Sequence, residues 1–196
     1  AGSVANALAE LSAIVGAVNV LYSAQLNLRL DVTAIFAFTS GAPVGRDLSP
    51  LPPNGRSNPA NSGICESPDD ASWSGTNILT SLIQWLWDAA PEPKRTFWHY
   101  FTGCTTSGVA GQAFIGAACS DYMRDYLSGW SRRTGSANLG PFMLTWFVAA
   151  HEIGHNLGAE HTDNLGIMGS YMSESRDTFH ATSARDLCGG VRRLQS

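Results

Sequence analysis

Three histidines and a glutamate lie close together between residues 151 and 161, and they are the side chains best suited to chemistry. Because His151 and His155 are four residues apart, a helix would place both imidazoles on one face, one turn apart. Gly158 can end that helix in a left-handed residue, so that the chain turns back and His161 supplies a third nitrogen. Three neutral imidazoles with one position left to water describe a catalytic Zn²⁺ site rather than a structural one.

Glu152 follows the first of these histidines and is predicted to act as a general base without binding the metal. A bare His-Glu-x-x-His string also occurs in ordinary helices, but the further Gly and His at fixed offsets make this pattern specific. The chain has five histidines, and three of them fall within the pattern. We therefore interpret His151, His155 and His161 as Zn²⁺ ligands and Glu152 as the catalytic residue, rather than as polar side chains on a solvated helix face.

The complete pattern resembles that of the metzincin clan of zinc endopeptidases, and residues 151–158 are most similar to its adamalysin or reprolysin branch. This clan has a methionine-containing turn beneath the metal, for which Met168 is the first candidate and Met172 the second. Thr162 follows the third histidine where that branch usually has Asp, and the short, Cys-free run to the methionine resembles the matrixins. Tyr171 lies near this turn, where some metzincins have a Tyr that assists the transition state, but its offset differs and we expect it to pack.

The composition indicates one globular domain. A length of 196 residues with 44% apolar and 14% charged residues is enough for a real core and argues against disorder. The net charge of −4 and the lack of a basic cluster argue against nucleic-acid binding. Four cysteines without Cys-x-x-Cys spacing predict two disulfides and hence a secreted or extracellular protein. The first residue is Ala rather than Met, so we expect that an upstream segment has been removed.

The beginning of the chain is predicted to form a helix followed by a strand. Residues 3–26 are rich in Ala, Leu and Val, and 11–28 carries no formal charge, so a membrane span or signal peptide must be considered. Polar side chains interrupt this stretch and no basic region precedes it, which favours a helix packed on the core and no membrane span. Apolar and polar residues then alternate over 26–38, which predicts a half-buried strand.

The middle of the chain holds a long loop and two further strands. Residues 39–72 contain six of the nine prolines and predict a loop at the rim of a cleft rather than a linker between domains. Apolar spacing predicts a helix over 74–88. Strands are predicted over 96–102 and 126–132, and His99 in the first is expected to be a core histidine rather than a ligand.

Side-chain caps are expected at the start of two later helices, where backbone N–H groups lack partners. Asn138 is expected to cap the metal-binding helix, with Pro141 in its first turn and 142–148 forming its buried side. Asp177 is expected to cap a last helix, which would end near residues 189–190.

The resemblance implies a zincin-like fold of the α/β (α+β) class over most of the chain. A mixed, mostly parallel twisted sheet with long helices would form an upper subdomain, 1–157, with the zinc helix in the cleft. A small lower subdomain, 158–196, would carry the third ligand, the methionine turn and the last helix. Together they would form a single catalytic domain, 1–196. The clan begins with a strand before its first helix, whereas this chain begins in the helix itself.

The segment 111–119 resembles the adamalysin segment that precedes the zinc helix and ends in an antiparallel edge strand above the cleft. The resemblance implies that a protein or peptide substrate lies along this strand, at about 112–118, as an added strand. The implied activity is zinc-dependent hydrolysis of internal peptide bonds, and an upstream pro-segment is a further expected partner. Two alternatives stay open, a non-catalytic binding module and a zinc hydrolase of non-peptide substrates. The intact ligand set with Glu152 argues against the first, and the edge strand argues against the second.

The four cysteines allow three disulfide pairings. If the edge strand is extended, Cys104 and Cys119 lie about 25 Å apart, beyond the roughly 7 Å limit between bridged α-carbons. That separation excludes the Cys104–Cys119 bridge and therefore the pairing in which Cys65–Cys188 is the second bridge. Two pairings stay open. The adamalysin resemblance implies Cys119–Cys188, which would join the end of the edge strand to the last helix, together with Cys65–Cys104.

Overall fold

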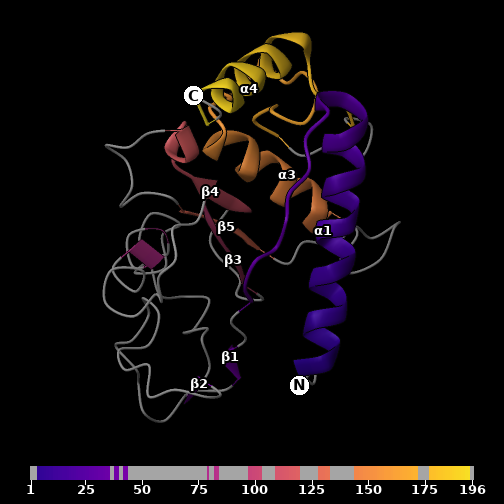
Figure 1. Ribbon diagram of the computed structural model, residues 1–196, viewed down its shortest axis with the longest axis vertical. Helices are drawn as coiled ribbons and strands as arrows, with labels where there is room; N and C mark the ends of the chain where they lie inside the picture. Colours follow the sequence, from indigo (N-terminus) through magenta and orange to yellow (C-terminus); the bar gives the residue numbers. More distant parts are fainter. Residues whose placement is uncertain are drawn as a thin grey trace.

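A computed structural model describes residues 4–35, 38–39, 42–43, 79, 82–83, 97–102, 109–119, 128–132, 144–171 and 177–194. In this part of the chain three helices accompany a small mixed sheet: α1 (Val4–Leu26), α3 (Thr145–Asn156) and α4 (Ala181–Leu194) (Figure 1). Helix α3 lies between the sheet and α1, and it contacts both. The helix that carries two of the predicted ligands is therefore enclosed by the rest of the fold.

The sheet has the strand order β3-β5-β4. Strand β3 (Trp98–Thr102) runs parallel to β5 (Ser128–Arg132), and β4 (Gly111–Ala113) runs antiparallel to β5. The strands predicted over 96–102 and 126–132 are confirmed, and so is the mixed character of the sheet. In this three-stranded sheet one strand pair is parallel and one is antiparallel, so a mostly parallel sheet is not evident among the described residues.

Helix α1 confirms the helix predicted over 3–26. One side of it enters the main hydrophobic core, where the side chains of five of its residues are buried: Ile14, Val18, Leu21, Tyr22 and Leu26. The Tyr22 hydroxyl donates a 2.8 Å hydrogen bond to the Ala150 carbonyl and so links α1 to α3. Helix α1 is also long and apolar enough to cross a membrane, with a mean hydropathy of 1.7. The core helix of a soluble protein and a signal sequence can have the same length and hydropathy. The absence of a membrane span stays a prediction.

The segment after α1 is not the strand predicted over 26–38. Residues 27–35 join no sheet in the described structure, and the only pairing nearby is between β1 (Phe38–Thr39) and β2 (Ala42–Pro43). The Asn19 side chain on α1 accepts a 2.7 Å bond from the Leu30 N–H and donates a 2.9 Å bond to the Leu30 carbonyl. These bonds satisfy backbone groups that a neighbouring strand would otherwise satisfy. The alternating pattern therefore reflects packing against a helix.

Both predicted side-chain caps are wrong. Leu144 is the N-cap of α3 and makes no side-chain cap bond, so Asn138 does not cap this helix. Helix α4 begins after His180, whose carbonyl accepts a backbone bond from its first turn, so Asp177 does not cap it. The Asp177 carbonyl instead accepts a 3.0 Å bond from the Gln25 side chain of α1. At the start of α4 the Thr182 N–H instead bonds to the His180 ring, 3.4 Å from its Nδ1.

Helix α4 also continues past residues 189–190, where the sequence predicts its end, and reaches Leu194. Leu187 on this helix is fully buried in the core. Tertiary packing of this kind stabilises a helix and can offset the low helix propensity of Gly189 and Gly190. Residues 79 and 82–83 are helical, as predicted for 74–88. Several predictions lie outside the described residues or side chains: Pro141, the disulfide pairing, Met172 and most of the loop 39–72.

Candidate metal centre

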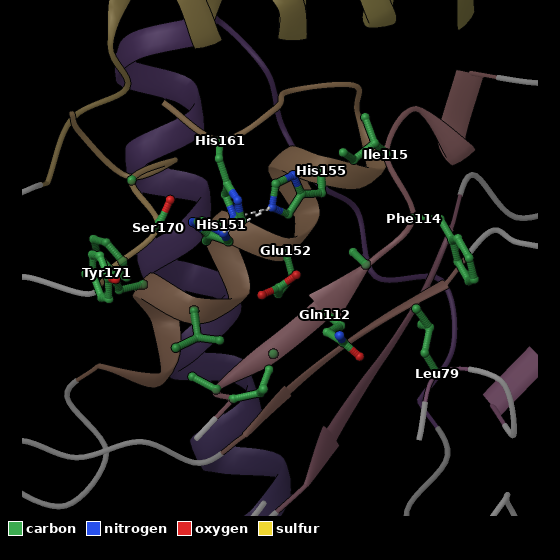
Figure 2. A pocket seen from close by; sticks show the side chains of 17 residues that line it. Leu79, Gln112, Phe114, Ile115, His151, Glu152, His155, His161, Ser170 and Tyr171 are labelled. Atoms are coloured by element: carbon green, nitrogen blue, oxygen red, sulfur yellow. Dashed lines mark hydrogen bonds between the residues drawn. The ribbon is translucent and has the colours of Figure 1, made fainter. Parts of the chain in front are cut away.

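Helix α3 and the turn that follows it bring the three predicted ligands together. His151 and His155 project from one side of the helix, as their spacing predicts. Gly158 has φ +107°, a conformation that favours glycine, and it redirects the chain after the helix. His161 then returns toward the helix, and Figure 2 shows the three imidazoles converging.

The three Nε2 atoms form a nearly equilateral triangle. Each lies 3.1 Å from the other two, for His151, His155 and His161. A tetrahedral site with Zn–N distances of about 2.0–2.1 Å requires nitrogens roughly 3.3 Å apart. The triangle therefore has the dimensions of three ligands around one Zn²⁺ ion.

Hydrogen bonds to the other ring nitrogens fix the tautomers of the two helical histidines. The Nδ1–H of His151 donates a 2.7 Å bond to the Ile167 carbonyl, and that of His155 donates a 2.7 Å bond to the Ala159 carbonyl. Because a carbonyl can only accept, each Nδ1 carries a proton and each neutral ring has a lone pair on Nε2. Two lone pairs 3.1 Å apart repel, and a cation held between them removes the repulsion. The donor set thus fits a metal ion.

The same two histidines are neutral at physiological pH. Burial lowers the pKa of His151 to about 3, and the nearby His155 lowers it further while the bond to Ile167 opposes the shift. Burial also lowers the pKa of His155 to about 4, against the opposing effect of its bond to Ala159. Neutral imidazole is the form that binds metal, so neither ring has to lose a proton at pH 7.

Glu152 is buried beside the histidines. Figure 2 shows its carboxylate between the three imidazoles and strand β4. Only 5% of the residue is exposed, and burial raises the pKa of the carboxyl well above its ordinary value. Its Oε2 has no hydrogen-bond partner among the described residues. Burying a carboxylate oxygen without a partner costs free energy, and such groups cluster at functional sites; this one lies beside the candidate metal ligands, where a general base would be needed.

Gly111 makes room for this carboxylate, and the sequence analysis did not identify its role. A Cβ at Gly111 would lie 2.7 Å from both Cγ and Oε1 of Glu152. Any larger residue would therefore displace the carboxylate or the strand. The sequence does place a glycine at the start of a short predicted strand. A glycine in a strand often marks a place where a ligand or another part of the chain comes close to the backbone.

Met168, the first candidate for the methionine turn, packs against the metal-binding helix. It is fully buried, and a Cβ at Gly154 on α3 would lie only 2.6 Å from its sulfur. The Thr162 N–H donates a 2.9 Å bond to the Met168 carbonyl, which ties this turn to the residue after His161. Tyr171, by contrast, lines the rim of the cleft and is 72% exposed, so little of its side chain has the packing role that was expected.

A cleft of about 610 Å³ runs between strand β4 and the histidines. One wall consists of residues 109–115, and the other consists of α3 together with residues 169–171. Glu152 is the only Asp, Glu, Lys or Arg among its described lining residues. The cleft is therefore largely apolar, with the polar groups concentrated at the metal centre.

Strand β4 is the antiparallel edge strand that the sequence predicts, but it is shorter. The extended part ends at Ala113, and a turn at 115–116 leads into the 3₁₀ helix η1 (Ala117–Cys119). Gly116, with φ +69°, makes this turn. A strand over 112–118 is thus wrong beyond residue 114. The exclusion of a Cys104–Cys119 disulfide assumed an extended run up to Cys119, and that assumption fails here.

The ladder between β4 and β5 shows which backbone groups of β4 face the cleft. The Arg132 N–H donates a 2.7 Å bond to the Ala110 carbonyl, and the Phe114 N–H donates a 3.4 Å bond to the Ser128 carbonyl. In an antiparallel pair the residues that bond to the neighbouring strand alternate. The N–H and C=O groups of Gly111 and Ala113 therefore point away from β5, toward the open edge.

Two further polar side chains, outside the group of three histidines, contact the sheet. The His99 ring is half-buried and places Nε2 2.8 Å from the Ser131 hydroxyl, which agrees with a packed, hydrogen-bonded histidine; that it is not a ligand stays a prediction. Asn156, the last residue of α3, is fully buried and bonded to backbone carbonyls of the sheet region. Asn156 was not among the predicted site residues. Its signal in the sequence is its place directly after the second histidine, because Asn is seldom fully buried unless it is hydrogen-bonded.

Comparison with known proteins agrees with this geometry. A family model described as metallo-peptidase family M12, of reprolysin type, matches residues 2–188. The chain is also similar to the disintegrin and metalloproteinase domain-containing protein B of Trichophyton verrucosum and to that of Arthroderma benhamiae. Each relative is 26% identical over 162 residues, which cover 80% of this chain and 19% of the relative. The chain thus spans less than a fifth of the length of these relatives.

Proposed function

This chain belongs to metallopeptidase family M12, in its reprolysin branch, and from that membership we propose that it is a zinc endopeptidase cleaving internal peptide bonds of proteins. The observation that supports the proposal best is the triangle of Nε2 atoms 3.1 Å apart, with two of the three tautomers fixed by backbone carbonyls. We propose His151, His155 and His161 as the zinc ligands and Glu152 as the general base.

When bound, zinc supplies a Lewis acid that polarises the scissile carbonyl and lowers the pKa of water to about 7. The chain's own contribution begins with ligand orientation. The carbonyls of Ile167 and Ala159 hold the rings of His151 and His155 so that both Nε2 atoms face the same point. These two bonds thus orient the proposed ligands toward one point.

Glu152 is proposed to move the protons. Its carboxylate takes a proton from the attacking water and later delivers it to the amine of the leaving group. Burial raises the pKa of this carboxyl, and a cation held by the neighbouring histidines would oppose that shift and favour the carboxylate form that the first step needs. The unpaired Oε2 is available for the water, and Gly111 keeps the carboxylate against β4.

Strand β4 is proposed to hold the substrate backbone. An extended peptide can add to an open strand edge, and the outward N–H and C=O groups of Gly111 and Ala113 are the groups that would pair with it. The substrate segment predicted at 112–118 is accordingly proposed to be bound by 111–115. A protein substrate suits such a site because backbone pairing requires a peptide.

The organisation of the whole chain is also a proposal. We infer a single catalytic domain over 1–196, with an upper part, 1–157, and a lower part, 158–196. The turn at Gly158 supports this division, since His161, Met168 and α4 all follow it. The even number of cysteines supports a secreted or extracellular location. An upstream pro-segment stays a proposed partner.

A direct test is hydrolysis of a denatured protein mixture by the purified chain, with and without the chelator 1,10-phenanthroline. We expect cleavage that stops with the chelator and returns with added Zn²⁺. A zinc-loaded protein that cleaves no peptide bond would contradict the proposal and favour the binding module or the hydrolase of other substrates. Cleavage that resists the chelator would remove zinc from the mechanism.

A further inference from the structure

We propose that Asn156 is a positioning residue that ties the exit of edge strand β4 to the end of the metal-binding helix. Its effect would be to set the separation between a peptide added to β4 and the three-histidine site. The role in catalysis rests on the proposed function, whereas the tie itself concerns the folded chain with or without metal.

The contacts of the Asn156 amide are specific. Its Nδ2 donates a 3.1 Å bond to the Phe114 carbonyl, just after β4, and a 3.0 Å bond to the Ser128 carbonyl at the start of β5. Both hydrogens of the NH₂ group are thus used, each on a different segment. The side chain is fully buried, so water cannot replace either bond. One residue of α3 therefore holds two segments of the sheet region at once.

A second bond reinforces the tie at the neighbouring residue. The Gly116 N–H, in the turn after β4, donates a 2.8 Å bond to the carbonyl of His155. His155 and Asn156 are consecutive, and together they hold both Phe114 and Gly116. The last turn of α3, which carries a proposed ligand, is thus bonded to the chain that leaves the proposed substrate strand.

Strand β4 needs such a tie because its own pairing is slight. It has three residues and one neighbour, β5, among the described strands. Ladder bonds to β5 fix which residues pair, but they constrain the tilt of a short edge strand toward α3 only weakly. A peptide paired with β4 must present its carbonyl at the metal, and a misplacement of about 1 Å can reduce the rate roughly 10²-fold.

The fold makes room for this amide at Gly129. A Cβ there would lie 3.1 Å from the Asn156 Oδ1 and 3.0 Å from the Ala113 Cβ. The oxygen Oδ1 has no hydrogen-bond partner among the described residues, so the donor half of the amide makes all of the bonds found. Replacement by Asp would turn this donor into an acceptor that faces two carbonyls, whereas Ala would remove the bonds without introducing a charge.

The first test is hydrogen exchange on the metal-free protein, comparing Asn156→Ala with wild type. We expect the Phe114 and Gly116 amides to exchange about tenfold faster in the variant, because the tie that keeps this segment closed is lost. The matched control is Asn19→Ala, which removes an Asn with two bonds to the Leu30 backbone far from the cleft. That change should accelerate exchange at Leu30 and leave 114–116 unaffected.

The second test uses the zinc-loaded protein and two ligands of different reach. For a peptide long enough to lie along β4, Asn156→Ala should lower kcat/KM by about 10- to 10²-fold, mainly through KM. The inhibition constant of acetohydroxamic acid, which reaches only the metal centre, and the zinc Kd should change less than about threefold. Asn19→Ala should alter none of these three quantities.

Several outcomes would overturn the inference. Unchanged exchange at 114–116 in a folded Asn156→Ala protein would show that no tie exists, whatever the activity. Equal losses for the peptide and for acetohydroxamic acid would show damage to the metal centre rather than a displaced strand. If Asn156→Ala does not fold, the nearly isosteric Asn156→Leu, which fills the same space without either bond, must give the same two signatures. A wild-type chain without peptidase activity would contradict the proposed function, while the exchange data would still decide on the tie.

Discussion

At the scale of single residues, Glu152 differs from the other acidic groups of the described chain because it is buried beside the three histidines and its Oε2 has no hydrogen-bond partner there. We predict that Glu152→Gln keeps its zinc and its fold while turnover falls by roughly 10²–10⁴ or more, because the proton acceptor is lost and no ligand is removed. Elemental analysis and peptide hydrolysis measure the two effects. The control is Glu160→Gln, an exposed residue nearby that should retain full activity. Unchanged hydrolysis in a zinc-containing Glu152→Gln protein would exclude Glu152 as the base.

His99 is the residue whose titration is separate from the metal. Burial lowers its pKa to about 3 from 6.5. Between these values the unfolded chain binds a proton that the folded chain excludes, so His99 makes the free energy of unfolding rise with pH and then level off above 6.5. We predict that the free energy of unfolding of His99→Gln rises less steeply with pH between pH 4.5 and about 6.5. The decrease in slope should correspond to at most one bound proton. Urea denaturation at several pH values measures it, and an identical slope in the variant would contradict the lowered pKa.

At the scale of elements, the ladder of β4 assigns different roles to neighbouring residues. Ala113 directs its N–H toward the open edge, whereas the Phe114 N–H bonds to the Ser128 carbonyl. We predict that Ala113→Pro raises KM for peptides at least about tenfold with the sheet intact, since Pro removes a donor that substrate would use. Phe114→Pro should instead destabilise the strand itself. Kinetics and circular dichroism on both variants test this, and a folded Ala113→Pro protein with normal KM would place the substrate elsewhere.

At the scale of the whole molecule, helix α3 connects the metal centre to both halves of the core, since it packs on α1 and on the sheet. A ligand that binds only the folded state stabilises it, by about 4 kcal/mol when its concentration is 1,000 times Kd. We therefore predict one zinc per chain and a thermal transition that falls by several degrees when a chelator removes it. The double variant His151→Ala, His155→Ala should show no zinc and no response to the chelator. Zinc retained by that variant would disprove the ligand assignment.

Local patterns in the sequence were sufficient for features that depend on neighbours along the chain. The apolar run of α1, the strands β3 and β5 and the metal-binding helix follow from periodicity. The spacing of His151 and His155 puts them on one helix face, and Gly158 permits the return of His161. For the same reason Met168, close after the third histidine, could be identified in advance.

Only the tertiary structure decided features in which distant segments meet. Asn19 satisfies the Leu30 backbone and removes the need for a strand over 26–38, and Gln25 bonds to the backbone at Asp177 and Phe179 just before α4. The short length of β4 and the room that Gly111 leaves for Glu152 likewise depend on contacts across the fold. Such hydrogen bonds and close approaches have no periodic signature, because the partners are separated by many residues and meet only when the core is packed.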